Sequence, residues 1–353
     1  MTEVVHEPSI LPGASGQNAT LSSPTERVTE REAEQLAREH YGLLGRARPL
    51  DGERDNNFEI ATSAGRFMLK VVHSSEQRSV TKCQTAVLAH LESVARELPV
   101  PRVVRALTGE SFVVPGSGPA AGQAIRMITF VEGRPLHAVQ TSAQLRSNLG
   151  RALAMLGRAL KSFDHPATTE PIHWDLAHLT DLRPLIGELT SLEHRATLAT
   201  LVDRFEANVK PLLSKQRAQV VHNDFSGDNV LVAADGVTIS GILDFGDMVR
   251  TELVNDVAVV AAYQLSDADD PTDTSIDVIN GYQQLTPLTD DELDLLLELI
   301  IARMVVRLTI TEWRAARFPD NATYILRNTP RTWAQLDTLL YTSRDDFRNR
   351  ITT

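Results

Sequence analysis

The sequence predicts an α+β protein with two lobes, a small β-rich N-terminal lobe and a larger, mostly helical C-terminal lobe. Three observations lead to this prediction. The chain has 353 residues, more than one hydrophobic core comfortably holds. Short segments of alternating polar and apolar residues gather before residue 131, and long segments with helical periodicity fill most of the remainder. A polar stretch between two short apolar runs, at residues 220–232, interrupts the helical part.

The N-terminal region begins with a predicted disordered tail at residues 1–24, rich in Ser, Pro, Gly and Thr and without periodicity. Thr29 and Glu32 form a capping-box pattern that predicts a helix ending near Gly42. We expect residues 25–131 to form the nucleotide-binding lobe.

A β-hairpin is predicted next. Residues 58–62 and 66–72 alternate in polarity around a turn at 63–65. Before it lies a polar loop at 50–57, whose backbone N–H groups could meet phosphates; Gly52 and Asn57 are its candidate nucleotide-binding residues. Lys70, on the second strand, is the candidate for contacting the donor phosphates.

A helix at 76–92, strands at 102–105 and 125–131 and a hinge at 132–135 complete the small lobe. Residues 132–353 form the expected catalytic and substrate lobe. Its expected helices lie at about 142–163, 176–187, 190–213, 252–264, 289–316 and 330–342. A turn at 233–236 joins the strand 230–232 to a returning strand at 237–240.

This returning hairpin is expected to bring Asn229 and Asp244 to the same end. One amide oxygen and one carboxylate suit Mg²⁺, which prefers oxygen ligands and keeps others for water and substrate phosphates. Asp224, five residues before the amide, can orient an acceptor hydroxyl and take its proton. With His222, these residues give the His-x-Asp-x₄-Asn and Asp-Phe-Gly arrangement of kinase-like enzymes.

The chain resembles the aminoglycoside phosphotransferase and choline kinase family of small-molecule kinases, and within it the hydroxylysine kinase group. The resemblance rests on residues 222–229, 49–58, 241–248, 174–176 and 182–184. It implies a protein-kinase-like fold and transfer of phosphate from ATP or GTP, with Mg²⁺, to the side-chain hydroxyl of 5-hydroxylysine. It also implies that Asp224 is the base, Asn229 and Asp244 hold Mg²⁺, Lys70 binds donor phosphates, and Asp247 supports the metal site.

The chain departs from the kinase pattern where a helix glutamate would pair with the strand lysine. Gln84 stands near that position and could substitute by hydrogen bonding, or Glu76 or Glu92 could reach in. The loop sequence at 225–228 also differs from the motif of hydroxylysine kinases, so the identity of the acceptor substrate stays open. An aminoglycoside O-phosphotransferase, a homoserine or choline kinase, and an inactive nucleotide-binding module are the alternatives.

Other polar residues are expected to support the site. His222 braces the catalytic loop, and Asp256 caps or anchors the following helix beside it. Arg303 and Arg307, one helical turn apart, either hold a substrate carboxylate or continue a polar stripe.

Charge and composition exclude some partners. The net charge of −11 disfavours nucleic acid and an anionic membrane surface as partners. The resemblance implies a small hydroxyl-bearing molecule as the partner instead. The acidic stretch at 267–294 is either a rim for a cationic substrate or a solvated face. One cysteine and no signal-peptide pattern favour a reducing, cytoplasmic location.

Overall fold

The computed structural model describes residues 27–50, 55–268 and 270–351. The chain divides into two compact units. Unit 1 contains the described residues up to 92 together with 101–130, and unit 2 contains 93–100 and 131–351. The tail predicted at residues 1–24 lies outside the described residues.

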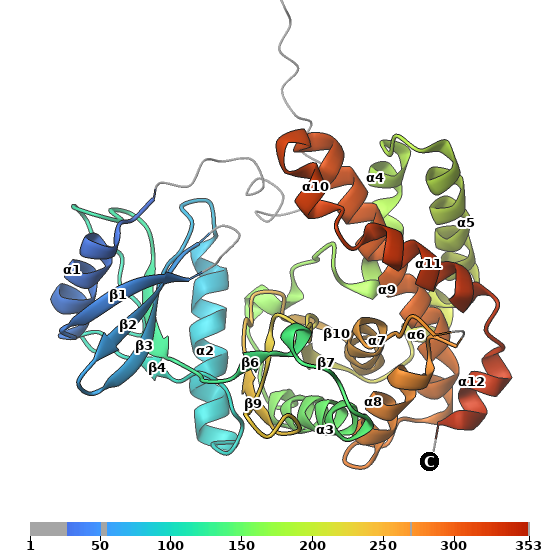
Figure 1. Ribbon diagram of the computed structural model, residues 1–353, viewed down its shortest axis with the longest axis horizontal. Coiled ribbons are helices and arrows are strands. Elements are labelled where there is room, and N and C mark those ends of the chain that lie inside the picture. The colour runs from blue at the N-terminus through green and yellow to red at the C-terminus, as the bar shows by residue number, and fades with distance from the viewer. Residues whose placement is uncertain (1–26, 51–54, 269, 352–353) are drawn as a thin grey trace, which may run out of the picture. The chain divides into compact units, whose positions relative to one another are not determined.

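Unit 1 is built on a five-stranded antiparallel sheet, shown in blue to green in Figure 1. In sheet order its strands are β1 (Gly45–Leu50), β2 (Asn56–Thr62), β3 (Gly65–Val71), β5 (Ile125–Thr129) and β4 (Val103–Val104). Two helices accompany the sheet, α1 (Glu30–Tyr41) and α2 (Arg78–Val94). The predicted hairpin at 58–72 is therefore confirmed as β2 and β3, paired in register around the turn.

The helix α1 begins and ends as the sequence predicts. The Thr29 side chain accepts a hydrogen bond from the Glu32 N–H, and the Glu32 carboxylate accepts one from the Thr29 N–H. Gly42 ends the helix with a φ of 67°, a left-handed conformation that glycine adopts without strain. The buried face of α1 packs with one face of the sheet, and the Tyr41 hydroxyl donates to the Ile125 carbonyl at 2.8 Å.

The edge strand β1 was not predicted from the sequence. Of its side chains only Ala47 is buried, so it lacks the alternating apolar pattern that marks a strand. Its pairing with β2 fixes it instead. As a result, Leu50 and Asn57 belong to strands, and the polar loop expected at 50–57 is shorter than predicted.

Unit 2 contains two small sheets. One has the order β6 (Arg134–Pro135), β8 (Val230–Val232) and β9 (Ile239–Ile242), which confirms the predicted hairpin of β8 and β9. The other pairs β7 (Ala218–Val221) with β10 (Val249–Glu252), a strand that the sequence did not indicate. The segment between β7 and β8 carries the polar motif.

Helices form the rest of unit 2 (Figure 1). They are η2 (Leu136–Ala138), α3 (Ala143–Leu160), η3 (Pro166–Thr169), η4 (Leu176–Leu182), α4 (Arg183–Gly187), α5 (Leu192–Asn208), α6 (Lys210–Leu213), α7 (Leu253–Tyr263), α8 (Asp273–Gln283), α9 (Asp290–Arg317), η5 (Pro319–Asn321), α10 (Ala322–Ile325), α11 (Thr329–Leu340) and α12 (Arg344–Arg350). Two predicted helices are each divided, because Pro184 and Pro211 restart the helix at α4 and α6. The predictions missed α8, α10 and α12.

Two features shape this unit. The long helix α9 contacts α5, α7, α11 and α12 and is buried along most of its length. The helices α3 and α8 cross closely at two glycines, because a Cβ on Gly150 would meet the Val278 carbonyl and one on Gly281 would meet the Ser147 carbonyl. No helix in the described residues is both long and apolar enough to cross a bilayer.

The acidic stretch at 267–294 is largely neutralised within the protein. Arginines from other segments form ion pairs with it: Arg331 with Asp267, Arg350 with Asp270 and Asp273, Arg146 with Asp277, Arg348 with Asp290, and Arg217 with Glu292. These acids therefore tie α8 and α9 to their neighbours, a use that neither reading of the sequence included.

Candidate active site

The polar loop after β7 is anchored by Asp256, in the first turn of α7. Its carboxylate accepts the backbone N–H groups of His222 and Asn223, at 3.2 Å and 2.8 Å. Asp256 is buried, and burial raises its pKa, although the two N–H donors and Arg303 act in the opposite direction. Asn223 has a φ of 63°, a left-handed conformation that Asn tolerates better than most residues. The helix α7 thus holds the loop in its bend.

His222 is fully buried inside the loop. Its Nε2 lies 2.9 Å from the Leu243 carbonyl and its Nδ1 lies 3.3 Å from the Asp224 N–H. These partners define a neutral ring with the proton on Nε2, since a carbonyl accepts and an N–H donates. The rings of Phe225 and Phe245 pack against it edge-on. His222 therefore links the loop to the strand that leads to Asp244.

Asp224 is the motif carboxylate, and its side chain is 23% exposed. The Asn229 Nδ2 donates to Asp224 Oδ2 at 2.7 Å and to the Asp224 carbonyl at 3.0 Å. On the other side, the Tyr263 hydroxyl donates to Oδ1 at 3.1 Å. Both carboxylate oxygens are thus held by protein donors, while part of the group stays accessible.

A buried arginine completes this arrangement. Arg303 Nη2 lies 3.4 Å from Asp224 Oδ1 and donates to the Tyr263 hydroxyl at 3.1 Å, and its Nη1 donates to the Trp174 carbonyl at 3.1 Å. The Arg303 side chain is 1% exposed. Burial acts to lower its pKa, but Tyr263, Asp224 and Asp247 outweigh that effect and raise it. A permanent positive charge therefore lies beside the motif carboxylate.

Asn229 and Asp244 are brought together as the hairpin predicts. The Leu243 N–H donates to the Asn229 carbonyl at 2.8 Å, which places Asp244 directly after the residue paired with Asn229. Asp244 is exposed, has a φ of 52°, and accepts the Gly246 N–H at 3.0 Å. Asp247 follows in the same turn, close enough to Arg303 to affect its pKa.

The donor set at this point fits a magnesium ion. Because the Asn229 Nδ2 is committed to Asp224, its Oδ1 is the atom left to ligate a cation, with the Asp244 carboxylate as the second candidate ligand. No group of three or more His, Cys, Asp or Glu side chains in the described parts of the chain could hold a metal ion. A site with two protein ligands suits Mg²⁺, which keeps several positions for water and phosphate oxygens.

Arg307 lies one turn after Arg303 and is partly buried. Its guanidinium stacks over the Tyr263 ring at 5.0 Å. Burial lowers its pKa. Tyr263 therefore contacts Asp224 with its hydroxyl and lies near both arginines, although it was not predicted from the sequence as a site residue. Its spacing from Asp256, two helical turns along α7, places both on one face and was the available signal.

In unit 1, Lys70 occupies the middle of a cross-strand row. Asn57 lies opposite it on β2 and Arg126 opposite it on β5. Its Nζ forms an ion pair with Asp55 Oδ2 at 2.7 Å, and both side chains are 13% exposed. Asp55 Oδ1 also accepts the His73 N–H at 2.8 Å. The partner of the strand lysine is thus an aspartate at the end of the polar loop, which the sequence analysis did not identify.

The three residues expected near Lys70 have different surroundings. Glu76 accepts the Thr81 hydroxyl at 2.8 Å, and its pKa is raised by burial and by Asp55, with Lys70 acting in the opposite direction. Gln84 is buried on α2, and its Oε1 has no hydrogen-bond partner among the described residues. Glu92 is exposed. Gly52 lies outside the described residues.

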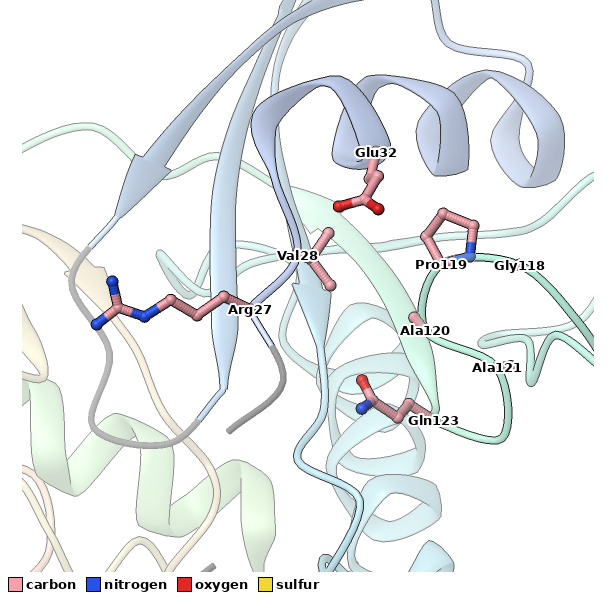
Figure 2. A pocket seen from close by; sticks show the side chains of 8 residues that line it. All are labelled: Arg27, Val28, Glu32, Gly118, Pro119, Ala120, Ala121 and Gln123. Atoms are coloured by element: carbon pink, nitrogen blue, oxygen red, sulfur yellow. The ribbon is translucent and has the colours of Figure 1, made fainter. Parts of the chain in front are cut away.

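A small cavity of about 180 Å³ opens elsewhere in unit 1 (Figure 2). It is lined by residues at the start of α1 and in the loop before β5, among them Val28, Glu32 and Gln123. Glu32 is already engaged in the helix cap, and none of the motif residues lines the cavity. It has no evident part in the chemistry.

Comparison with known structures defines the class of protein. The microcompartment-associated aminopropanol kinase superposes with a TM-score of 0.67, covering 86% of this chain and 98% of that one at 18% identity. The fold is therefore the bilobal, protein-kinase-like α+β fold, as the sequence predicted. Residues 46–288 match the model of the phosphotransferase enzyme family, and the chain belongs to that family.

Relatives with assigned activities extend over most of the chain. Hydroxylysine kinase of Mus musculus is 27% identical, with 93% of each chain covered. Homoserine kinase of Chelativorans sp. (strain BNC1) is 25% identical, covering 85% of this chain and 92% of its own. The protein is a phosphotransferase with an alcohol group as acceptor, and it resembles hydroxylysine kinase, as the sequence predicted.

Proposed function

We propose that this protein transfers the γ-phosphate of ATP or GTP to the side-chain hydroxyl of a small amino acid or amino alcohol of the hydroxylysine kind, with Mg²⁺ as the metal. The observation that carries the proposal is the geometry of Asp224. Its carboxylate is partly exposed and is fixed by Asn229, Tyr263 and Arg303. A carboxylate fixed in this way is suited to orient an acceptor hydroxyl.

In the transfer step, the acceptor oxygen forms a bond to the γ-phosphorus, and the bond from that phosphorus to the β,γ-bridging oxygen breaks. The products are a phosphate ester and a nucleoside diphosphate. Asp224 accepts a hydrogen bond from the acceptor hydroxyl and takes its proton as the new bond forms. The role of the protein is mainly positioning, since donors preset around Asp224 keep its oxygens in place.

Two residues would hold the metal ion. Asn229, through Oδ1, and Asp244 are the proposed ligands, and Asp247 supports their turn. A bound Mg²⁺ would neutralise charge on the donor phosphates. His222 and Asp256 are proposed to keep the loop in the conformation that presents Asp224 and Asn229, because they secure its backbone.

Unit 1 is proposed to bind the nucleotide, and unit 2 to carry the base and the acceptor. Lys70, steadied by Asp55, would contact the donor phosphates, with Asn57 beside it in the same row. The single cysteine, Cys83, is free and buried, which agrees with work in a reducing compartment such as the cytoplasm.

The test is a phosphate-transfer screen with ATP or GTP and Mg²⁺. The acceptors are hydroxylysine, homoserine, aminopropanol, choline, ethanolamine and kanamycin, measured by radiolabelled transfer. The matched variants are Asp224→Asn and Asp228→Asn, since Asp228 is an exposed carboxylate of the same loop that pairs with His137. We expect an amino acid or amino alcohol to be the best acceptor, and only Asp224→Asn to stop transfer.

A clear preference for kanamycin would replace this function with aminoglycoside phosphorylation. Nucleotide binding without transfer to any acceptor would indicate an inactive nucleotide-binding module.

A further inference from the structure

Arg303 and Arg307 of α9 differ in their burial and in their hydrogen-bond partners. They are four residues apart, about 6 Å along the helix axis. The Arg303 guanidinium is buried and donates to the Trp174 carbonyl and the Tyr263 hydroxyl beside Asp224. It therefore has no room for a second anion. Helical spacing makes Arg303 and Arg307 a pair in the sequence, but their contacts in the folded protein differ.

Arg307 has no comparable partner. Within the described residues, the Arg307 Nη1 donates to the Met304 sulfur at 3.8 Å, and no carboxylate lies within ion-pair distance of the guanidinium. Met304 sulfur is a weak acceptor. A partly buried guanidinium without a counter-ion is costly, because burial removes water without supplying a compensating charge. An anion that binds at Arg307 would remove this cost.

The position of Arg307 limits which anion that can be. Tyr263 lies under the Arg307 guanidinium with its ring, and its hydroxyl contacts Asp224. An anion at Arg307 is thus one tyrosine away from the proposed base, within unit 2. A molecule that spans the two points presents a hydroxyl at one end and an anionic group at the other.

We propose that Arg307 binds the α-carboxylate of the acceptor, and that the enzyme therefore selects hydroxy amino acids over the corresponding amino alcohols without a carboxylate. The inference rests on the proposed function, because it takes the acceptor hydroxyl to lie at Asp224. The planar guanidinium can meet a carboxylate with two parallel hydrogen bonds, a geometry that discriminates it from neutral groups.

The experiment compares matched acceptors that differ by the carboxylate. Homoserine is paired with 3-aminopropanol, and hydroxylysine with its decarboxylated diamine. KM and kcat are measured for the wild type, Arg307→Met and Arg307→Lys. Arg327→Met is the control, because Arg327 also stacks on a tyrosine, Tyr324, but on an exposed segment.

We expect Arg307→Met to raise KM about 10- to 150-fold for the carboxylate-bearing acceptor, the loss of a charge-assisted hydrogen bond. KM for its carboxylate-free partner and kcat for both should stay within about twofold of the wild type. Arg307→Lys should recover part of the affinity, because it keeps the charge and loses the fork. Arg327→Met should match the wild type.

An equal rise in KM for both members of a pair, or no rise for either, would overturn the inference. So would a wild type that uses 3-aminopropanol as well as homoserine, although that result would leave the proposed kinase function intact. If no acceptor is phosphorylated, calorimetric titration with homoserine and hydroxylysine tests whether Arg307 binds the carboxylate. Binding by the wild type that Arg307→Met loses, and Arg327→Met keeps, would support the carboxylate site. Equal binding by all three proteins, or none, would overturn it.

Discussion

The guanidinium of Arg303 lies 3.4 Å from the carboxylate of Asp224, and 1% of the arginine side chain is exposed. This contact joins α9 to the motif loop across 79 residues of sequence. The same guanidinium donates to the Tyr263 hydroxyl, which itself donates to Asp224. The motif carboxylate is therefore positioned by a cation and a phenol from two helices outside the motif.

Replacing Arg303 should impair turnover rather than substrate binding. Arg303→Met removes the donors that orient Asp224 and Tyr263, and we expect kcat to fall at least about tenfold, the lower value for losing a hydrogen bond to a charged group. Nucleotide affinity should not change, and Arg303→Lys should recover part of kcat. Steady-state kinetics with calorimetric nucleotide titration test this. An Arg303→Met protein that binds nucleotide and keeps wild-type kcat would remove the positioning role.

Asp224→Asn should lower kcat by at least about 100-fold, the lower range for losing a general base. The amide is similar in size, so the melting temperature and nucleotide affinity should remain close to those of the wild type. Asp228→Asn should leave kcat unchanged, because that carboxylate is exposed on the same loop and pairs with His137. A comparable loss in both variants would point to a disturbed loop rather than a missing base.

Asp244→Ala should remove the dependence of nucleotide affinity on Mg²⁺. The proposed metal site contains one other protein ligand, Asn229, and an ion held by a single amide binds weakly. Calorimetric titration with nucleotide, once with Mg²⁺ and once with a chelator, measures this. The wild type should bind nucleotide with different affinities under the two conditions, and Asp244→Ala should bind it with the same affinity under both. Wild-type affinity for the Mg–nucleotide complex in Asp244→Ala would place the metal elsewhere.

Asp55→Asn should weaken nucleotide binding about fivefold, because the ion pair that fixes Lys70 is worth about 1 kcal/mol at this exposure. Gln84→Ala is the matched test of the helix position and should have a smaller effect. Titration of both variants with Mg–ATP separates the two candidates for steadying Lys70. A larger loss of nucleotide affinity in Gln84→Ala than in Asp55→Asn would indicate that Gln84 of α2, and not Asp55, steadies Lys70.

Glu59 should make the stability of unit 1 depend on acid pH. Hydrogen bonds from Arg66 and then Arg48 hold its pKa below its usual range. The folded state therefore favours the ionised form, so the stabilisation is present above the unfolded pKa, about 4.3, and is lost as pH falls through the lower folded value.

Glu59→Gln should lower the free energy of unfolding by about 1 kcal/mol at neutral pH, allowing for the exposure of the arginines. The difference from the wild type should shrink towards zero as the pH falls through the lowered pKa of Glu59 in the folded state. Urea unfolding at several pH values measures it, with the exposed Glu92→Gln as control. A difference that does not change with pH would exclude the linkage.

The sequence was informative where one local rule decides the structure. The capping pair Thr29 and Glu32, the β2–β3 hairpin and the hairpin that brings Asn229 near Asp244 each follow from spacing and turn residues. The strand β1 and the divided helices were not predicted, because strand pairing and two prolines override the periodicity there.

The surroundings of the site were harder to predict for a different reason. Tyr263 and Asp55 show no motif of their own, and they matter through contacts with Asp224 and Lys70 that only the tertiary structure creates. The arginines of α9 were noticed from the sequence, but helical spacing alone makes them equivalent. Their difference arises from what each one meets in the folded protein.

The arrangement of Asp224 also bears on the synthesis of the chain. Asp224 and the residues that hold it lie on the motif loop, at the end of α7, on the segment that carries Trp174 and on α9. These segments are translated at widely separated times, and Arg303 comes last among them. A nascent chain that already displays the whole motif thus still lacks the cation beside Asp224. Ribosome-bound chains should therefore gain transfer activity only after α9 has emerged and folded against α7.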